Sequence, residues 1–444
     1  MNSRRIVSSW LAVLLLAFGA TAAQAQQQFT IITSFPRDLT DVYKKAFESR
    51  NPGIKVEVLN RSTSVAIAYV REAPAANKPD VFWASAPDAF EVLAKENLLA
   101  KVADLANPAV PKKVGAYPVN HPGGFYLGQA LAGYGLMWNT RYMKAHKLPD
   151  PKEWVDLMKP VYFSHVAISS PSRSGTTHLT IETILQGEGW EKGWRQVLMI
   201  TGNSAAITER SFGVPDGVNN GQYGIGLVID FFGLSAKASG FPVEFVYPSM
   251  TSIVPANIGL IANARNPELG RKFISFALSP EGQEILLDPK IRRLPVLPAT
   301  YAKAPSDYPN PFTGKIKARV NFDSELSESR YYVVSSIFDQ TITFRHRELV
   351  AVTKAIHEAT ARLTGKKNPE AQKLLDEARE LTFSPIVSET KSKDQEFLAL
   401  FRDTKRDALK IKQLTGLEEY WNSTARKNYV RAAELANRAA AMAK

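Results

Sequence analysis

Short apolar runs and longer amphipathic segments alternate along residues 28–300. Runs rich in β-branched and aromatic residues predict buried strands at 29–34, 54–59, 80–84, 166–169 and 224–229. Apolar residues at helical spacing predict helices at 38–50, 63–72, 87–95 and 176–186. Strands separated by helices of this length favour a parallel, doubly wound sheet. Because the pattern restarts near residue 166, we expect an α/β chain with two lobes.

The pattern changes near residue 309. The sequence Tyr-Pro-Asn-Pro at 308–311 is typical of a linker, and no strand is predicted after it. Asn368 and Pro369 form a typical helix start, an N-cap followed by proline. Further helices are expected at 324–364, 393–414 and 417–444. We therefore expect an all-helical C-terminal extension, which either covers one lobe or docks on a membrane partner.

The N-terminus has the features of a secretory signal. Arg4 and Arg5 precede an apolar stretch at 6–20, and Ala23 and Ala25 supply small residues for a cleavage site. The apolar stretch is short for a membrane span. We expect residues 1–25 to be removed as a signal peptide and the mature protein to reach the periplasm. An uncleaved N-terminal anchor is the alternative.

Composition narrows the class of protein. Of all residues 45% are apolar and 22% are charged, which is ordinary for a globular protein. The chain has no cysteine, so a hydrophobic core rather than disulfides must stabilise it outside the cell. Its net charge of +12 comes from basic residues interspersed with acidic ones. A nucleic-acid binder concentrates basic residues on a stripe, so we expect no nucleic-acid partner.

The segment Ser-Arg-Ser-Gly-Thr-Thr-His at 172–178 is the strongest candidate binding site. It follows a predicted strand and opens a predicted helix, whose first backbone N–H groups lack partners within the helix. Its hydroxyls add donors, and its glycine lets an anion approach the backbone. We therefore expect an anion site that needs no metal and no other cofactor. The alternative is an N-cap rich in Ser and Thr. The candidate ligand-binding residues are Ser172, Ser174, Gly175, Thr176, Thr177 and His178.

Three more candidate residues stand where predicted strands end. Ser34 and Ser85 close the first and third strands, and Asp230 follows the strand at 224–229. Ligands of open α/β sheets bind beyond the carboxyl ends of the strands, so we add these residues to the candidate site. Ser34 is equally typical of a turn, and Asp230 of a helix N-cap. Arg61 and Arg210 are candidate charge partners for an anion, with an ordinary surface position as the simpler interpretation.

Several motifs occur in an order and spacing that resemble a known family. They are Asp-Val-Phe-Trp-Ala-Ser at 80–85, Gly-Tyr-Gly-Leu-Met-Trp-Asn-Thr at 133–140, the loop at 172–178, Ser-Pro-Glu-Gly-Gln at 279–283 and Arg-Leu-Pro-Val at 293–296. Over about residues 28–305 the chain resembles family 1 extracellular solute-binding proteins of ABC importers. The resemblance implies a type II periplasmic-binding fold, in which two lobes trap a ligand. It implies hinge crossings near 131–139 and 251–261.

The resemblance suggests a division of the chain and a set of partners. We expect a signal peptide at 1–25, lobe 1 at 26–135 and 255–308, lobe 2 at 136–254, and a helical extension at 309–444. The implied protein is a receptor rather than an enzyme, with an ABC permease as partner, and we expect a monomer. The tail, including 321–323 and 343–346, resembles longer phosphoglycerate-type receptors that feed a sensor system, which adds a membrane sensor as a partner.

The resemblance also bears on the ligand. Iron(III)-binding members resemble one another in a pair of adjacent tyrosines, but this sequence has Phe231 and Phe232 after Asp230 in the corresponding region. The serine-rich loop instead resembles members that bind phosphorylated sugars, phosphonates or phosphoglycerate. We therefore expect a small anionic solute, either a phosphate ester or a phosphonate. A ferric-iron receptor of the same fold is the alternative.

Two alternatives come from other classes of protein. An exported hydrolase would need a nucleophile or metal motif, but the chain has neither Gly-x-Ser-x-Gly nor His-Glu-x-x-His, and its 6 histidines are scattered. A Ser-x-x-Lys spacing at 388–391 lies in polar surroundings typical of a surface loop. A structural or sensor-binding protein without a solute is the second alternative, and it would show no stabilisation by ligand.

Overall fold

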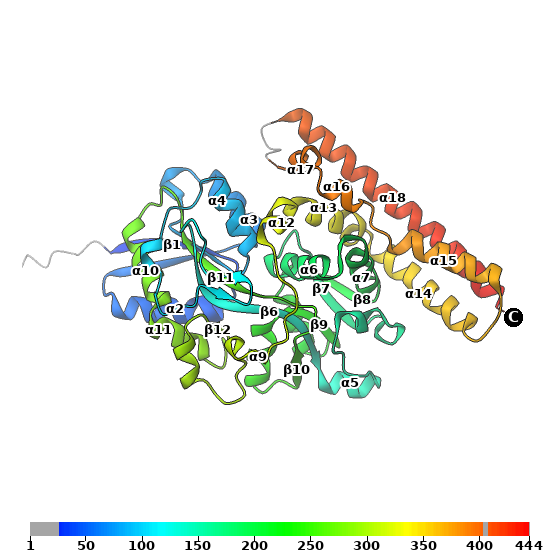
Figure 1. Ribbon diagram of the computed structural model, residues 1–444, viewed down its shortest axis with the longest axis horizontal. Helices are drawn as coiled ribbons and strands as arrows, with labels where there is room; N and C mark the ends of the chain where they lie inside the picture. Colours follow the sequence, from blue (N-terminus) through cyan, green and yellow to red (C-terminus); the bar gives the residue numbers. More distant parts are fainter. Residues whose placement is uncertain (1–25, 403–406, 444) are drawn as a thin grey trace, which may run out of the picture.

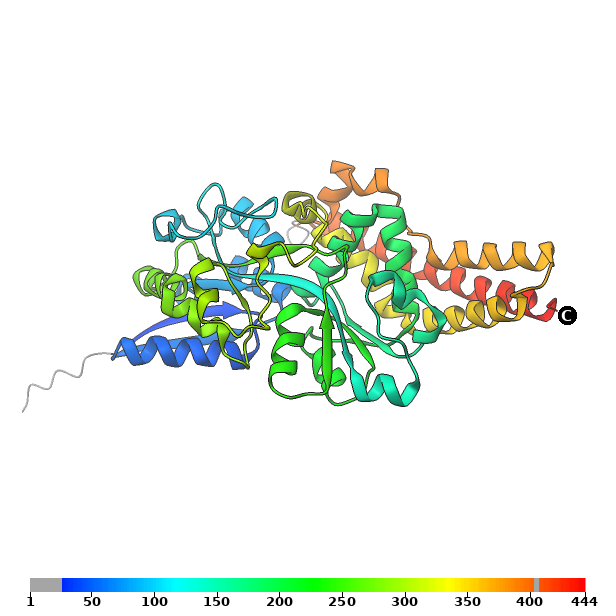
Figure 2. The same ribbon diagram turned by 60° about the horizontal axis from the view of Figure 1, so that its bottom comes forward.

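The computed structural model describes residues 26–402 and 407–443. The expected signal peptide, residues 1–25, lies outside these ranges. None of the helices within them combines the length and apolar character that crossing a membrane requires. The chain forms two α/β lobes side by side, and a helical arm projects from one of them (Figures 1 and 2).

Lobe 1 contains the first predicted strands and helices. Its parallel strands lie in the order β2 (Ile54–Asn60), β1 (Gln27–Thr33) and β3 (Val81–Ala84). The helices around them are α2 (Arg37–Arg50), α3 (Thr63–Glu72), α4 (Pro87–Lys95), α10 (Pro267–Leu278) and α11 (Pro280–Glu284). The strands and helices predicted at residues 29–95 are confirmed. In α2, for example, the buried Leu39, Tyr43 and Phe47 recur at the helical spacing that predicted it.

Lobe 2 repeats this arrangement. Strand β7 (Val166–Ser169) lies between β9 (Ile225–Ile229) and β8 (Ser204–Thr208) and is parallel to both. The helices are α5 (Thr140–His146), α6 (Gly175–Glu188), α7 (Trp190–Gly202), α8 (Gly213–Asn219) and α9 (Asp230–Ala238). The strands expected near 166 and 224 and the helix expected at 176–186 are confirmed. Strand β8 was not predicted, because Ser-Ala-Ala-Ile-Thr contains a single large apolar residue.

Two strands connect the lobes. Strand β6 (Leu127–Asn139) is buried along its whole length. It pairs with β11 (Ile253–Leu260) and β12 (Leu294–Pro295) on the lobe 1 side, and with β9 and β10 (Val243–Val246) on the lobe 2 side. All these pairings are antiparallel, so the sheet is parallel within each lobe and antiparallel at the junction. The hinge crossings implied near 131–139 and 251–261 fall on β6 and β11. A small hairpin, β4 (Lys113–Val114) and β5 (Tyr117–Pro118), lies outside this sheet.

The C-terminal extension is helical, as predicted. Its described helices are α12 (Ser324–Ser329), α13 (Tyr331–Thr341), α14 (His346–Leu363), α15 (Pro369–Phe383), α16 (Glu389–Ser392), α17 (Gln395–Leu400) and α18 (Ala408–Ala441). Asn368 caps α15 as expected, because its side chain accepts a hydrogen bond from the Ala371 N–H. Helices α14, α15 and α18 pack side by side and form the arm (Figure 1).

One pair of helix boundaries in the extension differs from the prediction. We expected helices at 393–414 and 417–444, but α17 ends at Leu400 and α18 runs through Gly416. Asp407 caps the start of α18, where its side chain accepts two backbone N–H groups. A glycine inside a helix costs about 1 kcal/mol. Packing of α18 against α13, α14 and α15 outweighs this cost.

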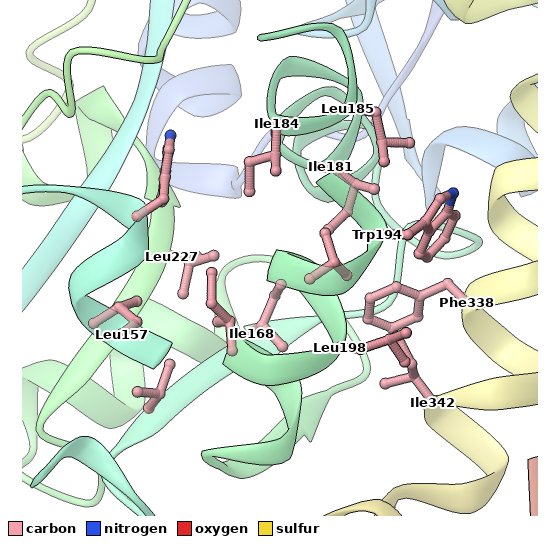
Figure 3. Packing of buried hydrophobic residues seen from close by; sticks show 14 of the residues in the cluster. Leu157, Ile168, Ile181, Ile184, Leu185, Trp194, Leu198, Leu227, Phe338 and Ile342 are labelled. Atoms are coloured by element: carbon pink, nitrogen blue, oxygen red, sulfur yellow. The ribbon is translucent and has the colours of Figure 1, made fainter. Parts of the chain in front are cut away.

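A shared hydrophobic core anchors the extension to lobe 2. Phe338 and Ile342 of the extension lie against Trp194 and Leu198 of α7, and the four side chains are buried (Figure 3). The same cluster continues into the interior of lobe 2, where it includes Ile168 of β7. Because this apolar surface is removed from water on both sides, the extension behaves as part of lobe 2. This packing fits the expectation that the extension covers one lobe.

The shared core yields a prediction about stability. Phe338 is 0% exposed, so Phe338→Ala leaves a cavity and should lower the free energy of unfolding by about 3–5 kcal/mol. Phe344 lies close by in the sequence but is 51% exposed, so Phe344→Ala should change that free energy by about 0.5 kcal/mol or less. Urea unfolding of both variants measures the difference. Equal effects would show that the extension is not anchored through this core.

Candidate functional site

A narrow polar cavity lies where the two lobes meet. Residues that follow β1 and β3 line it from lobe 1, and residues that follow β7, β8 and β9 line it from lobe 2. The volume of the cavity is about 20 Å³, which is room for about one water. At this cavity the two lobes are in direct contact, as the Gly175–Thr63 hydrogen bond shows. Of the expected site residues, the lining includes Ser34, Ser85, Ser174, Gly175 and Thr176.

The N-terminus of α6 faces this cavity with one open backbone donor. Ser174 is the N-cap of the helix, and its Oγ accepts a hydrogen bond from the Thr177 N–H at 3.1 Å. The Gly175 N–H donates to the hydroxyl of Thr63 from lobe 1 at 3.2 Å. Among the described residues, the Thr176 N–H has no partner. The helix therefore offers an unsatisfied N–H group, in the positive field of its dipole, to the cavity.

Arg293 places a buried positive charge next to the cavity. Its guanidinium lies over the rings of Phe35 and Phe231, 4.3 and 4.8 Å from their centres, and both rings line the cavity. Its Nη2 donates to the hydroxyl of Ser85, another lining residue. Its Nε and Nη1 have no hydrogen-bond partner among the described residues, although the side chain is 0% exposed. Unpaired buried donors on a cation are costly, so a negative charge is strongly favoured here.

Asp230 lies near Arg293, but its hydrogen bonds are made elsewhere. Its carboxylate accepts from the Gly133 N–H of β6 at 2.7 Å and from the Tyr247 hydroxyl at 3.0 Å. Burial raises the pKa of Asp230 to about 6, although these hydrogen bonds and the charge of Arg293 oppose the shift. Burial also lowers the pKa of Arg293 to about 10. At neutral pH the guanidinium therefore remains charged.

The structure places His178 away from the cavity lining. This side chain is 0% exposed and does not line the cavity. Its Nδ1 lies 2.6 Å from Oδ2 of Asp88 in α4, and its ring packs against Tyr331 of the extension. The physical reason is the helical turn of α6, which sends side chains three and four positions apart to one face. His178 faces the protein interior, whereas Thr176 faces the cavity.

Three further expected residues also lie outside the cavity lining. The Ser172 hydroxyl is 2.8 Å from that of Ser170 and belongs to a different pocket. Thr177 is buried and contributes its N–H to the cap of α6. Asp230 is the first residue of α9 and binds the junction strand β6, as described above, and it is not the N-cap of that helix.

Sequence reasoning missed several residues that the fold brings to the cavity. Arg173 and Ser211 line it. Arg210, which the sequence offered as a candidate charge partner, also lines it and donates to the side chain of Asn60 across the lobes at 3.2 Å. Arg293 is the most consequential omission. The sequence places it only in a family-like motif at 293–296, and no local pattern indicates that its charge lies beside Ser85. The other candidate charge partner, Arg61, does not line the cavity.

A wider outer cleft of about 870 Å³ adjoins the cavity. The two share Pro36, Phe231 and Phe232 as lining residues. Acidic groups face the outer cleft from both lobes, Asp38 from α2 and Asp216 from α8. Partial burial, together with the negative charge of Asp38, raises the pKa of Asp216. The cleft thus combines an inner end suited to a negative charge with an outer end that carries both carboxylates and the basic residues Arg37 and Lys290.

The chemistry of the lining residues does not suit a metal ion. Phe231 and Phe232 stack on each other at the cavity, and neither ring has a ligand atom. Residues 26–402 and 407–443 contain no group of three or more His, Cys, Asp or Glu side chains placed to hold a metal. Hydroxyls, backbone N–H groups and arginines are donors, and donors recognise oxyanions.

The raised pKa of Asp230 predicts a pH dependence of stability. Its folded pKa of about 6 exceeds the ordinary value of 3.8, so unfolding releases its proton between about pH 4 and pH 6. The contribution of Asp230 to stability should therefore fall as pH rises through that window, by roughly 3 kcal/mol in total. Asp230→Asn should remove this fall, as measured by urea unfolding of both proteins at a series of pH values. Parallel curves from pH 4 to pH 6 would contradict the shift.

Comparison with known proteins supports one family. The family described as bacterial extracellular solute-binding protein matches residues 76–315. The chain is also 30% identical over 385 residues to the phosphoglycerate transport regulatory protein of Salmonella typhimurium, covering 86% of this chain and 92% of that relative.

Solved structures show the same fold. The periplasmic binding protein AfuA from Actinobacillus pleuropneumoniae, solved with fructose-6-phosphate bound, has a TM-score of 0.63 at 20% identity, over 72% of this chain and 99% of AfuA. Iron-bound HitA from Pseudomonas aeruginosa has a TM-score of 0.57 at 17% identity, over 70% of this chain and 98% of HitA. The expected type II periplasmic-binding fold with a helical extension is confirmed. The chain belongs to the family of bacterial extracellular solute-binding proteins.

Proposed function

We propose that this protein is the periplasmic substrate-binding protein of an ABC importer and captures a phosphate ester or phosphonate between its lobes. The observation that carries the proposal is the buried guanidinium of Arg293, with two unpartnered nitrogens beside Ser85. A phosphoryl group in the cavity would supply the missing acceptors. Thr176, with its open N–H, and the hydroxyl residues Ser34 and Ser174 line this cavity from both lobes.

Capture would require the lobes to move. The cavity has room for about one water, so a phosphoryl group could enter only when the lobes separate, and would be held with the lobes slightly further apart than in this structure. Donors from lobe 1 and lobe 2 would then meet on the same anion as the lobes close. Binding energy gained on both sides would favour the closed arrangement over the open one. Strands β6 and β11, which connect the lobes, would act as the hinge.

The outer cleft favours an organic phosphate over inorganic phosphate as the solute. It adjoins the cavity and has a volume of about 870 Å³, which suits the remainder of a small organic molecule. Its aromatic side chains favour an apolar or ring-shaped part, and Asp38 and Asp216 favour hydroxyl or amino groups. Phosphoglycerate is named for one similar protein and fructose-6-phosphate for another, which supports this class of solute.

The proposal includes partners and a compartment. A permease of the importer would receive the solute, and a membrane sensor would bind the helical extension or a lobe. The signal-like sequence at 1–25 supports delivery to the periplasm. The protein would act as a monomer and without a cofactor.

We propose no enzymatic activity, because the cavity presents donors to an anion and no paired nucleophile and base. The Ser-x-x-Lys spacing at 388–391 lies on the short helix α16, where Ser388 accepts the Lys391 N–H as a cap.

A ferric-iron receptor is the second candidate within this fold. The observation that favours it is that iron-bound HitA has the same fold. The phenylalanines at 231 and 232 and the donor-rich cavity favour an oxyanion instead.

Substitution of Arg293 tests the proposal. Arg293→Gln removes the charge while keeping much of the side-chain volume and one donor group. Affinity for 3-phosphoglycerate or fructose-6-phosphate should fall by at least about a hundredfold, since hydrogen bonds to a charged group contribute about 1.5–3 kcal/mol each. Calorimetry on the mature protein measures this change. Full affinity in a folded Arg293→Gln variant would overturn the assignment of the anion site.

A second pair of variants controls for effects on the loop itself. Thr176→Ala removes a hydroxyl that lines the cavity and should weaken binding by about tenfold. Ser172→Ala removes a hydroxyl from the same loop that lies outside the cavity, so affinity should not change. Equal effects of the two substitutions would indicate that the loop responds only through its conformation.

Metal independence is a separate prediction. Because the cavity binds through N–H and hydroxyl donors, exhaustive treatment with a chelator should leave the affinity for these phosphate esters unchanged. Calorimetry before and after chelation, with metal content measured by elemental analysis, provides the comparison. Loss of binding that ferric ion restores would favour the iron receptor.

A further inference from the structure

The two lobes touch each other directly at a buried polar contact, which we call the seam. Asp88 in α4 belongs to lobe 1 and His178 in α6 belongs to lobe 2, and both side chains are 0% exposed. Their Oδ2 and Nδ1 atoms are 2.6 Å apart. Nearby, the Ser64 hydroxyl of lobe 1 donates to the Ser172 carbonyl of lobe 2 at 2.6 Å. Separating the lobes would break the seam and bring both of its ionisable groups into water.

A segment of the extension covers the seam. We call residues 323–339, which comprise α12 and most of α13, the latch. It lies against α4 on one side and α6 on the other (Figure 1). The Ser327 hydroxyl donates to the same Oδ2 of Asp88 at 3.0 Å, and the Tyr331 ring lies 4.3 Å from the His178 ring, centre to centre. Lobe 1, lobe 2 and the latch therefore meet at one buried point.

Apart from the buried Ser327–Asp88 hydrogen bond and the packing of Tyr331 in the core of lobe 1, the latch holds lobe 1 through two charged contacts that are partly open to solvent. Lys95 Nζ donates to the Glu328 carboxylate at 2.6 Å, and the lysine side chain is 49% exposed. Arg71 donates to the Tyr332 hydroxyl at 2.6 Å, and its side chain is 33% exposed. Water can replace such contacts when they break, so each contributes modestly to stability.

The main contact of the latch with lobe 2 is an ion pair that is shut off from solvent, and a partly buried hydrogen bond adds to it. Arg330 donates two hydrogen bonds of 2.8 Å to the Glu182 carboxylate of α6, and its guanidinium lies 5.0 Å from the centre of the Trp190 ring. Both charged side chains are buried. The Ser170 hydroxyl donates to Asp339 at 2.7 Å. Breaking a buried ion pair leaves an uncompensated charge, so these contacts are much harder to separate than those with lobe 1.

Further contacts join the latch to the arm. The Ser336 hydroxyl donates to Glu418 of α18 at 2.6 Å. Just beyond the latch, the Tyr429 hydroxyl of α18 donates to the Thr341 carbonyl at 2.9 Å. The latch, the arm and lobe 2 therefore form one packed unit. When the lobes separate, we expect the contacts of this unit with lobe 1 to break first.

We propose that the latch stabilises the closed arrangement of the lobes and that opening of the cleft detaches it from lobe 1 while it stays with lobe 2 and the arm. The arm then changes its position relative to lobe 1 whenever the cleft opens. A membrane partner that contacts lobe 1 and the arm together would bind the two states differently. The connection to solute exchange rests on the proposed function, whereas the connection between latch and lobe closure does not.

Distance measurements between the lobes test this proposal without any solute. The chain has no cysteine, so dyes can be attached at chosen positions. Lys45→Cys in α2 and Ala145→Cys in α5 are exposed sites on lobe 1 and lobe 2. In this background Ser327→Ala, Glu328→Ala and Tyr332→Phe together remove the hydrogen bonds of the latch to Asp88, Lys95 and Arg71. The ratio of open to closed molecules, read by single-molecule energy transfer, should rise by roughly tenfold or more.

Two further variants keep the result interpretable. Lys95→Ala changes one exposed side chain, folds without difficulty, and should shift the ratio in the same direction by a smaller factor. Arg431→Gln removes an exposed ion pair with Glu434 within α18 of the arm and should leave the ratio unchanged. A distance distribution that is identical in the wild type, the triple variant and Lys95→Ala would overturn the latch.

A final measurement separates this proposal from the proposed function. Dissociation of 3-phosphoglycerate or fructose-6-phosphate should be faster from the triple variant than from the wild type, because the closed state that retains the solute is less populated. If neither compound binds the wild type but the distances shift, the latch stands and the proposed class of solute is wrong. If a compound binds and the distances do not shift, the class of solute stands and the latch is wrong.

Discussion

The structure depends on a positive charge held out of water at the meeting point of the lobes. The Arg293 guanidinium lies between two aromatic rings, reaches Ser85 with one nitrogen, and leaves two nitrogens without partners among the described residues. Burial of such a group is unfavourable by itself. Aromatic faces and the nearby carboxylate of Asp230 offset part of the cost. The unfavourable free energy of burial that remains makes the cavity beside the guanidinium attractive to an oxyanion.

The topology explains why this charge meets donors from elsewhere in the chain. Loops that follow β1, β3, β7, β8 and β9 converge at the cavity, because the carboxyl ends of the parallel strands of both lobes are directed toward the junction. Strand β6 belongs to both halves of the sheet, so the lobes are connected without a flexible linker. Asp230 accepts the Gly133 N–H of that strand, which ties the acid beside the cavity to the hinge.

The extension turns a two-lobed receptor into a protein of three interacting parts. Its apolar residues complete the core of lobe 2, and its polar residues reach lobe 1 at the seam. His178 illustrates the consequence, since a residue from the serine-rich loop contacts lobe 1 and the extension rather than the cavity. The ion pairs on the two sides differ: Arg330–Glu182 toward lobe 2 is buried, whereas Lys95–Glu328 toward lobe 1 is half-exposed at the lysine. This asymmetry allows lobe movement to be passed to the arm.

The sequence by itself determined the elements and the broad chemistry. Short apolar runs predicted the strands of residues 29–95, because strands buried on both faces are apolar throughout, and a period of 3.6 residues predicted the helices and the helical extension. It also determined that hydroxyls and a glycine stand at the start of α6, because N-terminal helix chemistry is local.

Only the tertiary structure decided which of these residues share a cavity. Within 172–178 neighbouring side chains point in different directions, so Thr176 faces the cavity while Ser172 and His178 do not. Arg293 is more than a hundred positions from the loop and reaches the site through the chain path that leads into β12 beside β6. Local sequence patterns also could not predict the contacts between the latch and lobe 1. Contacts between distant segments depend on how the lobes and the extension pack, and no periodicity along the chain encodes that arrangement.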